Sequence, residues 1–145
     1  MPVDVQHREN CCVEPVIYDG QRLPFDDRSF DLVYAMDVLH HCDDPQRSVK
    51  ELARCSSQYV LIKDHTYRKS MGRLTLCVLD EVGNRRFGVP CLYKYQREWE
   101  WSPWLEEAGF VVEKLIHPAR CHTSVIGGLL NRLEFIVLWK RTSDE

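Results

Sequence analysis

The sequence contains no C-x-x-C pair, no long apolar run and no excess of basic residues. Its seven cysteines are scattered apart from the adjacent Cys11 and Cys12, so we expect reduced thiols and no redox centre. No apolar run approaches the roughly 20 residues of a membrane-spanning helix, and we expect no membrane partner. With 19 basic and 22 acidic residues, the net charge of −3 offers no basic face for nucleic acid.

The N-terminal segment, MPVDVQHREN, lacks the apolar core of a signal peptide, so we expect a cytoplasmic protein. Hydrophobic residues make up 44% of the chain and charged residues 28%, which is typical of a folded soluble protein. The 145 residues contain no repeat and no linker long enough to separate domains. We therefore predict one domain, residues 1–145, with a sizeable buried core.

Strand-like and helix-like runs alternate along the chain. The strand-like runs lie at residues 15–18, 30–36, 58–63, 110–116 and 133–140, whereas residues 2–5 are too short to predict a strand. The first helical run begins at Pro45, after a capping Asp43 or Asp44. Two further helical runs occupy residues 69–82 and 102–108. Gly83-Asn84 and Gly109 are the expected helix stops. This order predicts an α/β protein with a mostly parallel sheet, flanking helices and a C-terminal antiparallel strand pair.

Acidic residues follow two successive predicted strands. Asp19 comes directly after residues 15–18, and Asp37 directly after residues 30–36. Ligands of open α/β sheets bind in the crevice outside the carboxyl ends of the strands. Asp19-Gly20 alone also reads as ordinary turn chemistry. The ordered series favours a ligand site, in which we expect Asp4, Asp19 and Asp37 to converge along one rim.

The segment from Asp19 to Pro45, DGQRLPFDDRSFDLVYAMDVLHHCDDP, resembles the central block of class I S-adenosylmethionine-dependent methyltransferases, and the type-11 group in particular. That block reads D-x-x-x-L-P-F-x-x-x-S-F-D-x-V and is followed by a short strand and a His-containing turn. The downstream order of elements is also similar, and the resemblance extends from Val3 to Arg141. It implies a Rossmann-like fold, S-adenosylmethionine as cofactor and methyl transfer to a small-molecule acceptor.

The resemblance also implies roles for residues on the cofactor side. Asp4 corresponds to the acidic residue that holds the ribose, although an N-terminal aspartate can also be merely solvated. Asp19 corresponds to the adenine reader, and Gly20 lets the backbone approach the ligand closely. Asp37 and Val38 correspond to the turn beneath the methyl-donor sulfonium, which a carboxylate helps to hold.

On the acceptor side, the resemblance implies that His40 or His41 orients or deprotonates the substrate. Adjacent histidines point in different directions, so we expect at least one of them to be structural. Lys63, Asp64 and His65 end a strand and are expected to face the acceptor pocket, although a Lys-Asp pair that stabilises the strand end is an equal alternative. Four aromatic residues are candidates either for the pocket lining or for packing: Tyr93, Tyr95, Trp99 and Trp101.

One part of the family pattern is missing. Members carry a first strand and a glycine-rich loop of the form D/E-x-G-x-G before the ribose-binding acidic residue, and this sequence contains no such glycine cluster. We expect a truncated enzyme with impaired cofactor binding; a natural short form and a decayed copy are the alternatives. Loss of the first strand predicts unpaired sheet edges.

Those edges favour a second hypothesis, a non-catalytic methyltransferase-derived module that docks on a partner chain or on itself. A third is a metal-dependent hydrolase built from polar residues at the strand ends, whose types suit zinc. No H-E-x-x-H or paired-cysteine spacing supports it, and we predict no metal site. Its residues would be Asp37, His40, His41, Cys42, Asp64 and His65.

Overall fold

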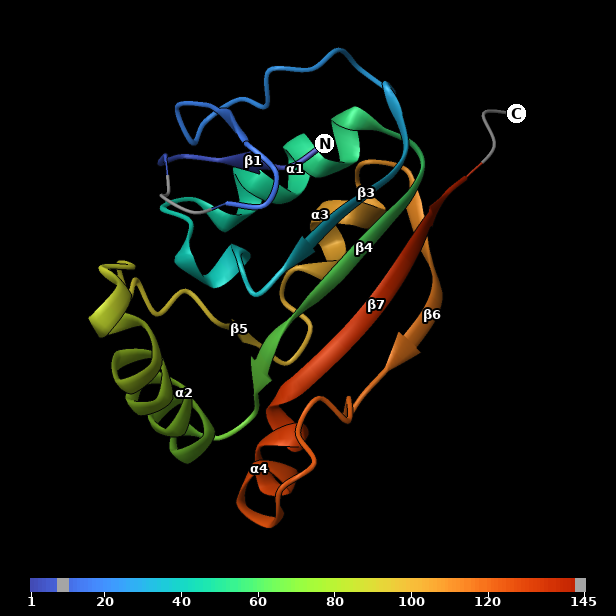
Figure 1. Cartoon of the computed structure of the whole chain (residues 1–145). Coiled ribbons are helices and arrows are strands. Elements are labelled where there is room, and N and C mark those ends of the chain that lie inside the picture. Colours follow the sequence, from blue (N-terminus) through green and yellow to red (C-terminus); the bar gives the residue numbers. More distant parts are fainter. Residues whose placement is uncertain (8–10, 143–145) are drawn as a thin grey trace.

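The computed structural model describes residues 1–7 and 11–142. A mixed five-stranded sheet forms its centre, with helices behind one face and around one end (Figure 1). The strand order is β3-β4-β7-β6, and the two-residue strand β5 (Gln96–Arg97) adds to the far end of β4. The predicted α/β fold class is confirmed.

Both parallel and antiparallel pairings occur in this sheet. Strand β3 (Phe30–Met36) runs parallel to β4 (Ser56–Tyr67), and β7 (Glu134–Arg141) is antiparallel to both β4 and β6 (Phe110–Ile116). The predicted C-terminal strand pair is therefore confirmed. Strand β4 is longer than predicted, because the polar residues Lys63 to Tyr67 keep pairing, first with β7 and then with β5.

The helix α1 (Pro45–Cys55) begins as the sequence predicts. The carboxylate of Asp44 accepts a hydrogen bond from the backbone N–H of Arg47 at 3.0 Å, and Pro45 occupies the first helical position. Together with α3 (Ser102–Glu106), α1 covers one face of the sheet (Figure 1). Between them lies the hydrophobic core, whose largest fully buried side chains include Phe110, Phe135 and Leu105.

The opposite face of the sheet is open. On β3 the side chains of Leu32, Tyr34 and Met36 alternate with core residues and are 47%, 62% and 52% exposed. Their neighbours Leu61 on β4 and Leu138 on β7 continue this apolar surface. Among the described residues no helix lies over this face of β3, β4 and β7 (Figure 1).

The N-terminal strands do not join the main sheet. Strands β1 (Val3–Asp4) and β2 (Val16–Ile17) pair in parallel as a separate two-stranded sheet. Residues 2–5 thus contribute a strand that their length alone did not predict. Asp4 therefore lies on a small sheet that is separate from the five-stranded sheet.

Two helical segments lie at the end of the sheet where β3 and β4 finish (Figure 1). They are α2 (Ser70–Asn84) and α4 (Val125–Leu130), and short 3-10 turns follow at Arg85–Phe87 and Asn131–Leu133. The predicted stop at Gly83-Asn84 is confirmed, since α2 ends at Asn84; the 3-10 turn that follows ends at Gly88, which has a φ of 67°. In the described part of the chain, no helix has the length and apolar character needed to cross a membrane.

We expect Arg141 to be a major contributor to stability. Its guanidinium donates to the carbonyl oxygens of Ala53 and Ser56 at 2.6 and 2.9 Å and lies 4.4 Å from the Phe110 ring centroid. Substitution Arg141→Met should lower the free energy of unfolding by about 2–4 kcal/mol, because charged hydrogen bonds are lost and carbonyl groups lose their partner. Urea denaturation measures the change. The exposed neighbour provides the control: Lys140→Met should change stability by less than about 0.5 kcal/mol, and equal losses would contradict the assigned role.

Candidate functional site

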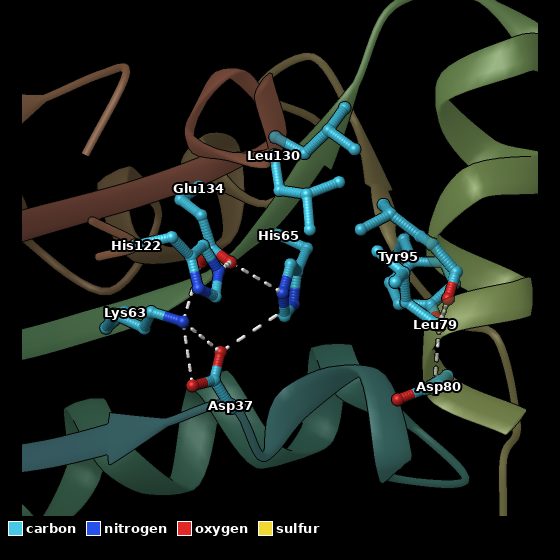
Figure 2. Close-up of a pocket in the computed structure, with 11 residues that line it drawn as sticks. Asp37, Lys63, His65, Leu79, Asp80, Tyr95, His122, Leu130 and Glu134 are labelled. Carbon is cyan, nitrogen blue, oxygen red and sulfur yellow. Dashed lines mark hydrogen bonds and ion pairs between the residues drawn. The ribbon is translucent and has the colours of Figure 1, made fainter. Parts of the chain in front are cut away.

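A cavity of about 240 Å³ lies at the carboxyl ends of β3 and β4 (Figure 2). Charged groups of three strands and the β6–β7 connection form one side of it, and leucines of the helical segments form the other. Its lining consists of Asp37, Lys63, His65, Leu76, Leu79, Asp80, Tyr95, His122, Leu130, Leu133 and Glu134. The cavity therefore has the position expected for a ligand site in an open α/β sheet.

Asp37 and Lys63 form an ion pair at the cavity wall. The Lys63 Nζ lies 2.6 and 2.7 Å from the two carboxylate oxygens of Asp37, and 2.6 Å from Glu134 Oε2. Burial alone would lower the pKa of Lys63, but these two carboxylates outweigh it and raise the pKa. Asp37 has a φ of 52°, a left-handed conformation that aspartate tolerates better than most residues and that is concentrated at functional sites.

Glu134 connects two imidazoles. Its Oε1 lies 3.1 Å from the Nε2 atoms of both His65 and His122 (Figure 2). Burial favours neutral His65, yet the carboxylates of Asp64 and Glu134 outweigh burial and raise the pKa of His65 to about 9. Burial likewise opposes ionisation of Glu134, but His65 and Lys63 hold its pKa at about 2. At neutral pH the cavity thus presents a protonated His65 beside an ionised Glu134.

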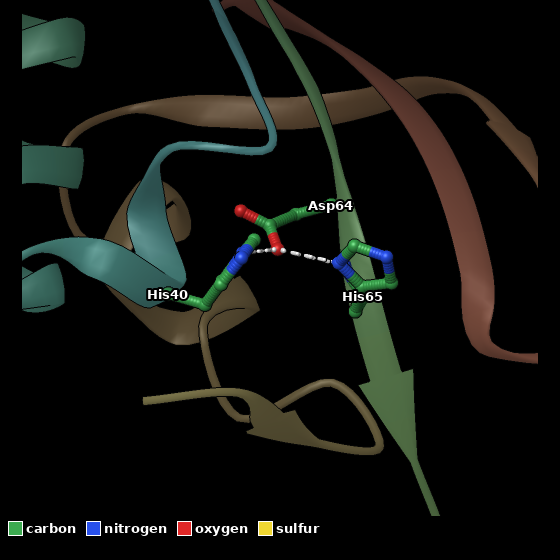
Figure 3. A group of neighbouring side chains, drawn as sticks. All are labelled: His40, Asp64 and His65. Atoms are coloured by element: carbon green, nitrogen blue, oxygen red, sulfur yellow. Dashed lines mark hydrogen bonds and ion pairs between the residues drawn. The ribbon is translucent and has the colours of Figure 1, made fainter. Parts of the chain in front are cut away.

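Asp64 lies behind this wall and is fully buried (Figure 3). It accepts hydrogen bonds from the backbone N–H of Leu39 at 3.1 Å and of His65 at 2.7 Å, and its Oδ1 lies 2.6 Å from His40 Nδ1. Burial opposes its ionisation, but His40 and His65 outweigh burial and keep the pKa of Asp64 below its usual value. Asp64 therefore positions the cavity residues from behind and does not line the cavity itself.

His40 and His41 lie outside the cavity lining. His40 is 1% exposed and stacks on Tyr95, with 5.1 Å between the ring centroids. His41 Nδ1 lies 2.9 Å from the carbonyl oxygen of Pro90, and burial together with His40 lowers the pKa of His41. Among the described histidines, His65 and His122 are the ones that line the cavity.

Of the four aromatic candidates for the pocket lining, only Tyr95 lines the cavity. Its hydroxyl donates to Asp80 Oδ2 at 2.6 Å, and burial together with Asp80 raises the pKa of Tyr95. Trp101 is part of the hydrophobic core, Trp99 packs on Phe135, and Tyr93 donates to Glu81. The packing interpretation is therefore confirmed for Trp101.

The predicted adenosine-side residues lie apart from the cavity lining. Asp4 ends β1, and Asp19 follows the parallel strand β2 by two residues, so both lie at the carboxyl end of the small sheet. Asp19 Oδ1 accepts hydrogen bonds from the backbone N–H groups of Gln21 and Arg22, which lower the pKa of the exposed carboxyl. Gly20 has a φ of 76°, and Val38 is exposed beside Asp37. Convergence of the three aspartates on one nucleoside remains a prediction.

Three polar residues of the cavity were not predicted from the sequence: Asp80, His122 and Glu134. Glu134 begins β7, and the antiparallel direction of β7 places its first residue beside His65 at the end of β4. Only knowledge of the strand pairing would have identified Glu134, because no local pattern in the sequence marks it.

Comparison with known proteins shows which family part of this chain resembles and which solved structures share its fold. Residues 3–58 match the methyltransferase domain family. Similar folds occur in the partner of the Trm112 methyltransferase activator from Haloferax volcanii (15% identity, TM-score 0.63) and in an S-adenosylmethionine-dependent methyltransferase from Methanosarcina mazei (17%, 0.58). A third is the magnesium protoporphyrin IX methyltransferase from Synechocystis, solved with bound S-adenosylhomocysteine (21%, 0.53).

These matches cover 90%, 88% and 89% of this chain but only 61%, 66% and 52% of the respective relatives. The chain thus spans between about half and two thirds of the length of these proteins. It has a class I methyltransferase domain fold, and the resemblance predicted from the segment Asp19–Pro45 is confirmed by the family match over residues 3–58.

We expect His65 to make stability depend on pH. Because its pKa of about 9 in the folded protein exceeds the ordinary 6.5, its contribution is complete below pH 6.5 and is lost as the pH rises through about 9. The free energy of unfolding should therefore fall over this range in urea titrations. Substitution His65→Gln should flatten the decline, whereas His7→Gln, at an exposed position, should keep it. An unchanged slope in His65→Gln would rule this mechanism out.

Proposed function

We propose that the chain carries the adenosine- and acceptor-binding parts of an S-adenosylmethionine-dependent methyltransferase that acts on a small molecule. The observation that carries the proposal is the cavity at the carboxyl ends of β3 and β4, lined by Asp37, Lys63 and His65, within a methyltransferase fold. The relative solved with S-adenosylhomocysteine supports the choice of cofactor. A cavity of about 240 Å³ suits a small acceptor.

The proposed cofactor site uses the ends of three strands. Asp4 accepts from the ribose hydroxyls, Asp19 from the exocyclic amine of adenine, and Gly20 allows close approach of the backbone. The sulfonium lies above Asp37 and Val38. No D/E-x-G-x-G loop occurs in this sequence to hold the methionine portion, so the affinity of this chain for the cofactor is low.

The proposed acceptor site is the cavity itself. Methyl transfer is an in-line displacement, so holding the acceptor in the right orientation supplies much of the catalysis. In this proposal a protonated His65 donates a hydrogen bond to the acceptor, and the ionised carboxylates of Asp37 and Glu134 accept hydrogen bonds from the acceptor. Because His40 and His41 do not line the cavity, they act as positioning residues in this proposal, in place of the predicted role of orienting or deprotonating the substrate directly.

Calorimetric titration with S-adenosylhomocysteine tests the cofactor assignment. We expect weak but measurable binding, which Asp19→Asn reduces about tenfold because a charge-assisted hydrogen bond to the adenine amine is lost. The matched control is Asp26→Asn, which alters an exposed aspartate of the following loop and should bind as the unaltered chain does. Absence of binding near the solubility limit of the ligand would overturn the proposal, as would equal affinities of the two variants.

A second function is favoured by the open apolar face of the sheet. A methyltransferase-derived module could use Leu32, Tyr34 and Met36 to dock on a partner chain or on a second copy of itself, since exposed apolar patches commonly mark interfaces. The Haloferax volcanii relative was solved in complex with an activator protein, which is compatible with a docking role.

Light scattering coupled to size-exclusion chromatography tests this alternative. We expect the chain to self-associate as its concentration rises, and Tyr34→Glu to shift it towards the monomer by placing a charge on the open face. Leu129→Glu also alters an exposed apolar residue, but on α4 away from this face, and it should leave the elution unchanged. A chain that stays monomeric at high concentration would exclude self-docking.

A further inference from the structure

Next to the cavity, the imidazoles of His40 and His41 face the carboxylate of Asp80, which also lines the cavity. His40 and His41 end the 3-10 turn Leu39–His41, and Asp80 comes from the helix α2. The metal-ligating atoms of these three residues all lie within 4.8 Å of one another. Residues far apart in the sequence thus bring together two nitrogen donors and one oxygen donor.

The Nδ1 atom of each imidazole already has a hydrogen-bond acceptor. His40 Nδ1 lies 2.6 Å from the Asp64 carboxylate, and His41 Nδ1 lies 2.9 Å from the carbonyl oxygen of Pro90. A carbonyl oxygen can only accept, and an ionised carboxylate can only accept, so Nδ1 carries the proton in both neutral rings. Each Nε2 then presents its lone pair, which is the arrangement that metal-binding histidines share.

The remaining distances suit a bound ion better than direct hydrogen bonds. Asp80 Oδ1 lies 3.7 Å from His40 Nε2 and 3.8 Å from His41 Nε2, which is too long for a hydrogen bond. Ligand atoms in a tetrahedral zinc site lie about 3.4 Å apart, given bonds of roughly 2.0–2.1 Å. Contraction by a few tenths of an ångström would bring Asp80 Oδ1 to this separation from each Nε2, and a water molecule would supply the fourth ligand.

The carboxylate is held in place as well. Asp80 Oδ2 accepts a hydrogen bond from Tyr95 at 2.6 Å, and Asp80 Oδ1 accepts one from Asn84 at 2.6 Å. Asp64, which supports His40, is itself fixed by the backbone N–H of Leu39 at 3.1 Å. All three candidate ligands therefore have the outer hydrogen-bond partners that tune and orient metal ligands.

A neighbouring cluster offers similar residue types but a different electrostatic state. Asp37, His65 and Glu134 also bring potential ligands within 4.8 Å of one another. There, however, the Lys63 ammonium lies 2.6 Å from both carboxylates and occupies the place that a metal cation would take. Between His40, His41 and Asp80, no lysine or arginine contact occurs among the described residues.

We propose that His40, His41 and Asp80 bind a divalent transition-metal ion of the zinc class. The ion links the turn after β3 to α2, a helix whose only buried residues are Leu76 and Asp80. Because Leu76, Leu79 and Asp80 also line the cavity, metal binding fixes one wall of the cavity. The site does not depend on the proposed methyl transfer.

Metal titration of the chelator-treated chain tests this site. We expect one equivalent of Zn²⁺ to bind and to raise the melting temperature, and Co²⁺ to give visible absorption bands without thiolate charge-transfer bands. His41→Gln and Asp80→Asn should each weaken Zn²⁺ binding about tenfold or more. His117→Gln alters a histidine outside the cluster and should leave binding unchanged.

Three results would overturn the proposal. The chain has seven cysteines, none of them in a disulfide among the described residues, so Co²⁺ spectra dominated by thiolate bands would place the metal on cysteine. Loss of Zn²⁺ binding in Glu134→Gln, with retention in Asp80→Asn, would place the metal in the neighbouring cluster. Unchanged binding in both His41→Gln and Asp80→Asn would exclude the site even if either variant were less stable.

Discussion

One buried carboxylate, that of Asp64, determines where the cavity residues lie. Burying an ionised group away from water is costly unless hydrogen bonds replace its hydration, and Asp64 receives them from Leu39, His40 and His65. These donors come from two segments, the turn after β3 and the strand β4. Asp64 therefore links the turn after β3 to β4. The positions of His40 and His65 follow from the need of its buried carboxylate for hydrogen-bond donors.

Charges in the cavity are paired before any ligand enters. Lys63 bridges Asp37 and Glu134, and His65 lies between Asp64 and Glu134. Such a network keeps each polar group in a fixed orientation, so little reorganisation is needed when an acceptor binds. The apolar half of the lining, supplied by leucines of the helical segments, excludes water and strengthens these interactions.

The sequence predicted what local chemistry controls. Asp44 and Pro45 mark the start of α1, the apolar run 30–36 marks β3, and the strand ends supplied Asp37 and Lys63. Contacts between distant segments could not be predicted in this way. Glu134 reaches the cavity only because β7 runs antiparallel to β4, and Asp80 reaches it only because α2 lies against the end of the sheet. The stop at Gly83-Asn84 was also predictable from local chemistry, since α2 ends at Asn84.

The connection that precedes the antiparallel strand β7 starts and ends at nearly the same point of the sheet. The backbone N–H of Ala119 bonds to the carbonyl oxygen of Glu134 at 2.9 Å, so residues 119–134 leave and rejoin the sheet at nearly the same point. Between Ala119 and Glu134, this segment carries three of the eleven residues that line the cavity, His122, Leu130 and Leu133. Replacing this one segment with another sequence, while Ala119 and Glu134 keep their positions, would therefore change which ligands the cavity selects and leave the pairing of the strands unchanged.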